Sequence, residues 1–298
     1  MEHGRGFGIF HEPVLLAEVL NFLAPAPGKV IVDATVGTGG HAEALLSFGA
    51  KVVGIDQDPE SLRIATSRLS PFQDRFLPVR GNFRSLLALL RELGVEKVDG
   101  VLFDLGLSSW HLSQAERGFS FQKEGPLDMR MDPDNPITAE KLVNELSERE
   151  LARILWEYGE ERCAESIAKA IVKNRPIKTT TELARIVAAC YPPRPHRIHP
   201  ATRTFQALRI AVNDELSALA EALPQALEVL KPGGVICVIS FHSLEDRIVK
   251  NFFRREAQVR RLSVLTKKPV RPSAEEVAKN PRARSARLRA AKVPEVSP

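Results

Sequence analysis

Three aspartates and one glycine-rich turn are the residues of this sequence whose types and spacing could do chemistry. Asp33, Asp56 and Asp104 each end a short apolar run of the kind that forms a buried strand. The turn at residues 37–42 follows the first run, and its glycines would let a ligand approach the backbone and the start of the next helix. Carboxylates at strand ends can hold hydroxyl groups, attract a cation or accept a proton. We therefore expect a ligand site where these strands end.

Two kinds of cofactor fit the glycine-rich turn. Residues 37–42 match the pattern G-x-G-x-x-A, in which a helix N-terminus binds the pyrophosphate of a dinucleotide. Asp33 would repel a pyrophosphate, but its charge suits a cationic sulfonium or an ammonium group. With Asp56 placed for the hydroxyls of a ribose, the arrangement resembles the S-adenosylmethionine site of the Rossmann-like methyltransferases. A sheet without a nucleotide, with ordinary turn glycines, is the third interpretation.

Alternating strands and helices must position these residues. Apolar runs predict strands at residues 30–32, 52–55, 76–79, 98–103 and 235–239, with helices between the first four and possible closing strands at 264–266 and 287–291. Such alternation is typical of an α/β, Rossmann-like fold with a mostly parallel sheet and right-handed crossovers. Ligands bind such sheets over the carboxyl ends of the strands, where the three aspartates are expected.

A helical insertion interrupts the alternation. Residues 110–201 show helical periodicity without convincing strands, and residues 191–200 form a proline-rich basic connector that we expect to be an extended loop. Helices at 202–223 and 225–230 then lead back to the sheet. We predict a discontinuous domain formed by residues 1–109 and 202–298, with an inserted helical domain at residues 110–201.

Composition excludes several classes of protein. Of the 298 residues, 44% are hydrophobic and 27% are charged, which is ordinary for a globular chain. No apolar run is long enough to span a membrane and no secretory signal begins the sequence, so we expect a cytoplasmic protein. The three cysteines are far apart, so they indicate neither a disulfide framework nor a zinc site, and no ligand cluster indicates another metal. The net charge is +5, and the basic residues between Arg254 and Lys292 suit phosphate contacts.

Six longer runs carry a resemblance to a known family. They are DLGLSS at 104–109, ERGFSF at 116–121, GPLDMRMDP at 125–133, HPATRTFQA at 199–207, SFHSLEDR at 240–247 and NPRARS at 280–285. These runs resemble the bacterial 16S ribosomal RNA cytosine-N4 methyltransferases of the MraW type, and the resemblance extends from His11 to about Arg289. It implies the class I methyltransferase form of the Rossmann-like fold.

The same resemblance implies a reaction, a cofactor and a partner. The chain would transfer a methyl group from S-adenosylmethionine to the exocyclic N4 amine of one cytidine in the decoding region of 16S ribosomal RNA. We expect it to meet this RNA within a small-subunit particle. The implied cofactor contacts are Gly39, Gly40, His41, Asp56, Phe83, Asp104 and His111. Here Ser-Ser-Trp precedes His111, whereas other family members have Ser-Ser-Pro followed by glutamine.

Asp104 is the first candidate for the catalytic group that accepts an N4 proton. The lone pair of this amine is delocalised into the ring, so the amine needs a well-placed base. Many amino-group methyltransferases have two prolines and an aromatic residue after the equivalent position, whereas residues 105–109 here read LGLSS. His242 and the loop at 128–132 are the next candidates. The expected phosphate contacts are Arg194, Arg197, Arg203, Arg282 and Arg284.

Two other functions fit parts of the sequence. An NAD-dependent oxidoreductase is favoured by the G-x-G-x-x-A match alone, and it would bind a nicotinamide cofactor. A noncatalytic RNA-binding ribosome-assembly factor would keep the fold and bind RNA with strong salt dependence, indifferent to S-adenosylmethionine. The intact arrangement of Asp33, Gly37, Gly39 and Asp56 argues against decay of the pocket.

Overall fold

The computed structural model describes residues 13–192 and 198–295, and these residues form two compact units. Unit 1 contains the described residues up to Gly106 and those from Ala218 onward, and unit 2 spans Leu107–Ser217. None of the helices in the described part of the chain combines the length and the apolar character that a membrane crossing needs.

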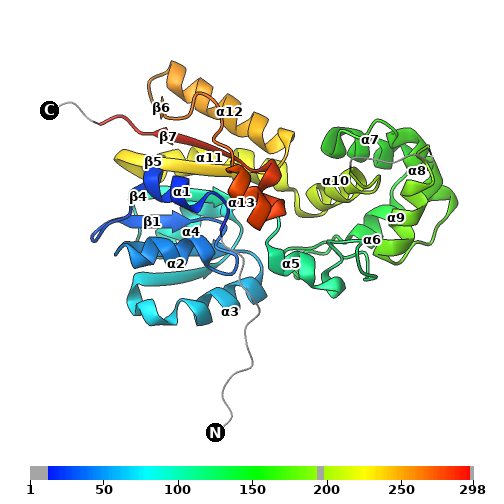
Figure 1. The fold of residues 1–298 in the computed structure, drawn as a ribbon, viewed down its shortest axis with the longest axis horizontal. Helices are drawn as coiled ribbons and strands as arrows, with labels where there is room; N and C mark the ends of the chain where they lie inside the picture. Colours follow the sequence, from blue (N-terminus) through cyan, green and yellow to red (C-terminus); the bar gives the residue numbers. More distant parts are fainter. Residues whose placement is uncertain (1–12, 193–197, 296–298) are drawn as a thin grey trace, which may run out of the picture. The chain divides into compact units, whose positions relative to one another are not determined.

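Unit 1 is built on a seven-stranded sheet with the order β3-β2-β1-β4-β5-β7-β6 (Figure 1). The strands are β1 (Val30–Asp33), β2 (Lys51–Asp56), β3 (Phe76–Arg80), β4 (Val98–Asp104), β5 (Leu230–Ser240), β6 (Ser263–Val264) and β7 (Arg287–Lys292). The first five strands run parallel, and β7 is antiparallel to both β5 and β6. The parallel strands therefore all end at one edge of the sheet, as the alternating pattern predicts.

Helices cover both faces of this sheet. They are α1 (Leu16–Leu23), α2 (Gly40–Ser47), α3 (Pro59–Arg68), α4 (Leu86–Glu92), α11 (Glu215–Val229) and α12 (Ser243–Gln258). A further short helix, α13 (Ala274–Lys279), buries none of its residues. In β1, Val32 joins a core formed with α4, α11 and α12, whereas its neighbour Ile31 joins a core formed with α1, α2 and α3. Successive strand residues point to opposite faces. A strand buried on both sides must be apolar throughout, which explains the short continuous apolar runs.

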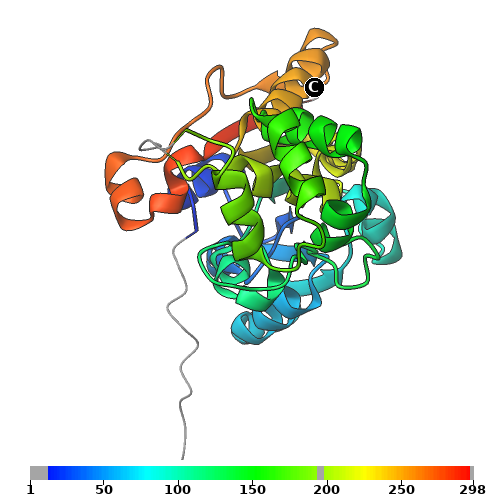
Figure 2. The same cartoon turned by 90° about the vertical axis from the view of Figure 1, so that its right-hand side faces the viewer.

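Unit 2 is helical, and its helices surround a core of their own (Figure 2). They are α5 (Ser109–Ser113), α6 (Ala139–Glu145), α7 (Glu148–Gly159), α8 (Ala164–Lys173), α9 (Thr180–Ala188) and α10 (Thr202–Asn213). The buried faces of α7, α8 and α9 contribute Leu155, Ile167 and Leu183 to this core. At the start of α7, Ser147 and Glu150 form a capping box that satisfies the first free N–H groups of the helix.

Two predicted boundaries differ in the structure. The break expected between helices at 223 and 225 lies instead at Asp214, which ends α10 with a φ of 47°, while Pro224 is accommodated inside α11. Aspartate tolerates the left-handed conformation that stops a helix. The helix α10 also groups with unit 2 and not with the sheet, because Phe205 and Leu208 are buried in the core of unit 2. The predicted insertion at 110–201 therefore ends before the observed unit does.

Burial on α4 gives a direct test of the sheet packing. Leu90 is fully buried, so Leu90→Ala should lower the free energy of unfolding by about 2–5 kcal/mol through lost apolar contact and a cavity. Leu93, at the end of the same helix, is 38% exposed, and Leu93→Ala should cost less than about 1 kcal/mol. Urea unfolding of both variants measures the difference. Equal losses would contradict the packing of α4 against the sheet.

Candidate active site

The three predicted aspartates meet at the carboxyl edge of the sheet, on the neighbouring strands β2, β1 and β4. Asp33 pairs in register with Gly54 of β2 and with Leu102 of β4. Both neighbouring strands continue two residues further, to Asp56 and Asp104. Asp33 therefore lies deeper than the other two, and only 1% of it is exposed.

Backbone N–H groups from the turn after β1 and from the residues after β2 hold the Asp56 carboxylate. Gly37 N–H donates to Asp56 Oδ2 at 2.8 Å, and Asp58 N–H donates to Asp56 Oδ1 at 2.9 Å. Gly37 has a φ of 53° and Gly39 a φ of 90°, which L-residues with side chains rarely adopt. A Cβ atom on Gly40 would lie 2.7 Å from Pro13 Cγ. Glycine therefore suits the backbone conformation at Gly37, whose N–H holds the Asp56 carboxylate, and leaves room for Pro13 beside Gly40.

His41, in the first turn of α2, lies between two hydrogen-bond acceptors. Its Nε2 is 3.0 Å from the carbonyl oxygen of Val14, and its Nδ1 is 3.4 Å from Asp104 Oδ2. A carbonyl oxygen can only accept, so Nε2 carries a proton, and a further proton lies between Nδ1 and the carboxylate. Burial alone would lower the pKa of His41, but the hydrogen bond and charge of Asp104 and the charge of Asp33 outweigh it and raise this pKa.

Asp104 has one fixed carboxylate oxygen and one available oxygen. Its backbone N–H donates to Thr35 Oγ1 at 2.6 Å, and its Oδ2 faces His41. Its Oδ1 is buried and has no hydrogen-bond partner among the described residues. A buried polar atom without a partner is costly. This oxygen is therefore ready to accept a hydrogen bond or a proton from a ligand.

Asp33 is the most deeply buried of the three acids. One of its oxygens accepts the N–H of Thr35 at 3.2 Å. Burial raises the pKa of Asp33 to about 7; the charge of His41 opposes this rise, and the charges of Asp104 and Asp56 add to it. Asp33 therefore changes its charge near neutral pH, and a cation bound beside it would favour the ionised form.

Phe83 lies at the end of the next strand outward. It begins a short 3-10 turn (Phe83–Ser85) after β3, and its ring packs edge-to-face on Phe103 at 5.5 Å between centroids. The ring is partly buried against the core and partly exposed, and β3 neighbours β2, the strand that ends in Asp56. A flat apolar ring one strand away from a carboxylate fits a nucleoside whose ribose the carboxylate would hold.

The structure brings together six of the seven predicted cofactor contacts. Gly39, Gly40, His41, Asp56, Phe83 and Asp104 all belong to the carboxyl edge of unit 1. His111 belongs to unit 2, where it is buried, and its Nδ1 lies 2.9 Å from the hydroxyl of Ser108. Thr35 was not among the predicted site residues. A hydroxyl residue two positions after Asp33 is the only signal that could have indicated it.

The other proton-acceptor candidates already have structural partners. His242 Nδ1 caps the N-terminus of α12 by accepting the N–H of Glu245, and its Nε2 lies 3.1 Å from Glu245 Oε1. Glu245 in turn accepts the N–H of Phe241 at 2.8 Å. In unit 2, Asp128 pairs with Arg130 at 2.8 Å. The predicted phosphate contacts Arg203, Arg282 and Arg284 are exposed, whereas Arg194 and Arg197 lie outside the described residues.

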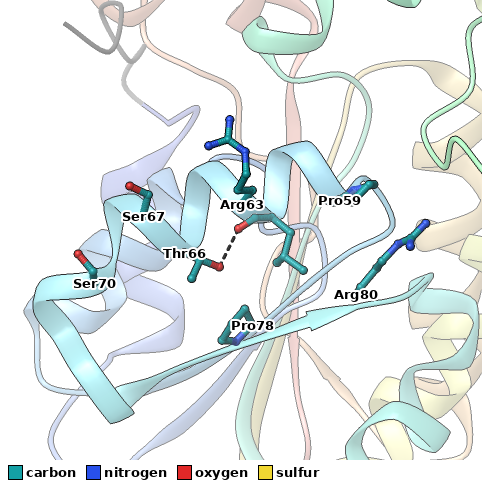
Figure 3. Close-up of a pocket in the computed structure, with 8 residues that line it drawn as sticks. Pro59, Arg63, Thr66, Ser67, Ser70, Pro78 and Arg80 are labelled. Carbon is teal, nitrogen blue, oxygen red and sulfur yellow. Dashed lines mark hydrogen bonds between the residues drawn. The ribbon is translucent and has the colours of Figure 1, made fainter. Parts of the chain in front are cut away.

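A shallow groove of about 610 Å³ lies on unit 1 beside α3 and β3 (Figure 3). It is lined by residues of α3 and β3 and the 3-10 turn between them, namely Pro59, Leu62, Arg63, Thr66, Ser67, Ser70, Pro78 and Arg80. None of the predicted site residues contributes to its lining. The carboxyl edge of the parallel strands, where the aspartates gather, is therefore the candidate active site.

The chemistry of the carboxyl edge discriminates between the two cofactors. Three carboxyl groups gather there, and one buried oxygen, Asp104 Oδ1, lacks a partner among the described residues. These carboxyl groups would repel an anionic pyrophosphate, whereas they would attract a sulfonium or an ammonium group. The residues present thus fit S-adenosylmethionine and do not favour a dinucleotide.

Fold and site together define a Rossmann-like methyltransferase. The chain belongs to the MraW methylase family, whose model matches residues 8–293. Ribosomal RNA small subunit methyltransferase H of Carboxydothermus hydrogenoformans is 54% identical, over 94% of this chain and 97% of that protein. The protein of the same name from Thermotoga neapolitana is 53% identical, over 98% of each chain. A solved rRNA methylase from Streptococcus thermophilus matches with a TM-score of 0.46 and 12% identity, over 93% of this chain and 95% of that one.

The burial of Asp33 predicts a pH-dependent stability. In the unfolded chain this carboxyl ionises near 3.8, but in the folded protein it holds its proton up to about pH 7. The protonated carboxyl therefore stabilises the folded state at low pH, and this contribution is lost as the pH rises from about 3.8 to about 7. Because asparagine cannot ionise, the free energy of unfolding of Asp33→Asn relative to wild type should rise by roughly 2–3 kcal/mol between about pH 5 and pH 8.

Urea unfolding of the ligand-free protein at several pH values measures this difference. Asp74→Asn, at an exposed position of the same unit, is the matched control. A difference between Asp33→Asn and wild type that stays constant with pH would show that Asp33 does not hold its proton in the folded state.

Proposed function

We propose that the protein transfers a methyl group from S-adenosylmethionine to the exocyclic N4 amine of a cytidine in the decoding region of 16S ribosomal RNA. Family membership over nearly the whole chain supports this reaction, as do relatives at 53–54% identity that are named ribosomal RNA small subunit methyltransferase H. The observation that carries the chemistry is the buried, unpartnered Oδ1 of Asp104, found at the carboxyl edge among the described residues.

Different residues of the chain bind different parts of S-adenosylmethionine. Bound S-adenosylmethionine supplies a methyl group activated by a positively charged sulfur. Asp56, held by the N–H groups of Gly37 and Asp58, is placed to accept hydrogen bonds from the ribose hydroxyls. The exposed part of the Phe83 ring packs on the adenine, and the backbone at Gly39 and Gly40 approaches the methionine part.

Asp104 serves the reacting amine. As the N4–methyl bond forms and the carbon–sulfur bond breaks, the amine must lose one proton, and Asp104 Oδ1 receives it. Thr35 fixes the backbone of Asp104, and His41 holds its other carboxylate oxygen, so the free oxygen keeps one direction. A positioned base of this kind contributes roughly 10²–10⁴ to the rate. Positioning matters here because the amine is a poor nucleophile.

We assign RNA recognition to the inserted helical domain that the sequence predicts at residues 110–201. A cytidine in folded RNA must be turned out of its stack to reach the carboxyl edge, so the surrounding strand needs a separate binding surface. Exposed basic residues of the insertion, such as Lys169 and Lys173 on α8 and Arg185 on α9, fit phosphate contacts. We expect the substrate to be a small-subunit particle in the cytoplasm.

A methyl-transfer assay tests the proposal. Small-subunit particles and free 16S RNA, both lacking the modification, would be incubated with S-adenosylmethionine labelled on the methyl group, and the nucleosides would be analysed. We expect label in N4-methylcytidine, more rapidly in particles, and loss of the label with Asp104→Ala. Label in another nucleoside would overturn the cytosine-N4 assignment. Tight RNA binding without any transfer would favour the ribosome-assembly factor.

A further inference from the structure

The positive charge of the chain is concentrated in one segment of unit 1. Residues 247–271 contain nine of the 42 lysines and arginines and only one of the 37 acidic residues. The segment therefore carries a net charge of +8, and the remainder of the chain carries −3. All nine basic residues are exposed, and we call them the basic ridge: Arg247, Lys250, Arg254, Arg255, Arg260, Arg261, Lys267, Lys268 and Arg271.

The periodicity of α12 explains why the first cations of the basic ridge point outward. The helix buries Val249 and Phe253 against the sheet core. Arg247, Lys250 and Arg254 follow one another at spacings of three and four residues, which places them on the opposite face. Within the part of the chain that the structure describes, neither Lys250 nor Arg254 forms an ion pair, so both charges are available to a ligand.

The one acidic residue of this segment is buried and pairs with two arginines of the basic ridge. Glu256 is only 5% exposed, and its carboxylate is paired with Arg255 at 3.1 Å and with Arg261 at 3.0 Å. The guanidinium of Arg255 also lies 5.4 Å from the ring centroid of Phe252. Residues 247–271 therefore present cations to solvent without a single exposed carboxylate among them.

The backbone beneath the second half of the basic ridge is tied to the sheet. Leu265 N–H donates to Ala290 O at 2.9 Å, and Val270 and Leu288 exchange two backbone hydrogen bonds, each of 2.9 Å. β6 pairs with β7, and α12 lies along both strands (Figure 1). The cations are thus placed before any partner binds, which reduces the entropy that binding would cost. A solvated flexible tail would lack this property.

The basic ridge starts at the same sheet edge as Asp104. β5 pairs with β4 so that Ile239 lies opposite Asp104, and α12 begins at Ser243, three residues after β5 ends. The 16 residues of α12 extend about 24 Å away from this edge. A nucleic acid strand whose target base is at the carboxyl edge could therefore continue along the ridge.

We infer that the basic ridge binds the phosphates of the ribosomal RNA strand that flanks the target cytidine. The inference rests on the proposed function. A fixed row of exposed cations with no exposed carboxylate within the same segment is complementary to a polyanionic backbone, whose binding releases counterions. The ridge would position the RNA without reading its bases, since phosphate contacts carry no sequence information.

Neutralising two ridge charges tests this inference. Lys250→Gln/Arg254→Gln is compared with Lys51→Gln/Lys97→Gln, which removes two exposed lysines at the amino ends of β2 and β4. Binding of each full-length protein, saturated with S-adenosylhomocysteine, is measured against a long 16S RNA fragment and a short oligonucleotide over a range of salt concentrations. Methyl transfer at saturating RNA is measured separately.

For the ridge variant we expect about tenfold weaker binding of the long fragment. The slope of the logarithm of the binding constant against the logarithm of the salt concentration should become shallower by about 1.4, or about 0.7 for each lost phosphate contact. Transfer at saturating RNA, binding of the short oligonucleotide and the control variant should all match wild type. Equal weakening in both variants, or unchanged binding in the ridge variant, would overturn the inference. If RNA binding depends on the ridge but the wild-type protein transfers no methyl group to the RNA, the inference stands and only the proposed function is wrong.

Discussion

The close approach of three carboxyl groups at one sheet edge is the constraint on which the candidate site depends. Like charges in a partly buried place repel each other and lose hydration, so each group needs its own compensation. Asp56 receives two backbone N–H groups, Asp33 is stabilised in its protonated form near neutral pH, and Asp104 faces His41. After this compensation, the Oδ1 atom of Asp104 still has no hydrogen-bond partner among the described residues.

Local backbone geometry makes this compensation possible. The turn after β1 brings the Gly37 N–H to Asp56, a partner 19 positions along the chain. Thr35, in the same turn, serves two acids at once, since its N–H reaches Asp33 and its hydroxyl accepts the N–H of Asp104. A single short loop therefore sets the positions of all three carboxyl groups, and the glycines in it are required for conformation as much as for ligand approach.

The sequence predicted the strands well because a strand buried on both faces must be apolar throughout. The same constraint predicts Asp33, Asp56 and Asp104 at one edge, since each ends such an apolar run. The sequence pattern does not predict which unit contains α10, at the end of the insertion. An amphipathic helix fits either unit, and only its packing partners decide which one it joins. The pattern also failed at Pro224, where the long helix α11 continues and the break falls at Asp214.

Contacts between distant residues were outside the reach of sequence patterns. His41 was expected only as a cofactor contact, since its partners Val14 and Asp104 lie 27 positions before and 63 positions after it. The burial of Glu256, which leaves no exposed carboxylate within the basic ridge, likewise follows from the packing of α12 against the sheet. The excess of positive charge in the C-terminal part was visible in the sequence, but its fixed arrangement was not.

The role of Asp104 as the proton acceptor is tested most directly by separating binding from chemistry in Asp104→Asn. Asparagine keeps the size of the side chain but cannot take up a proton at neutral pH. We predict that the affinity for S-adenosylhomocysteine changes less than about threefold, while the single-turnover rate of methyl transfer at saturating RNA falls by roughly 10²–10⁴. An unchanged rate would contradict the assignment of Asp104 as the base, and a loss of cofactor affinity that accounts for the whole effect would make Asp104 a binding residue only.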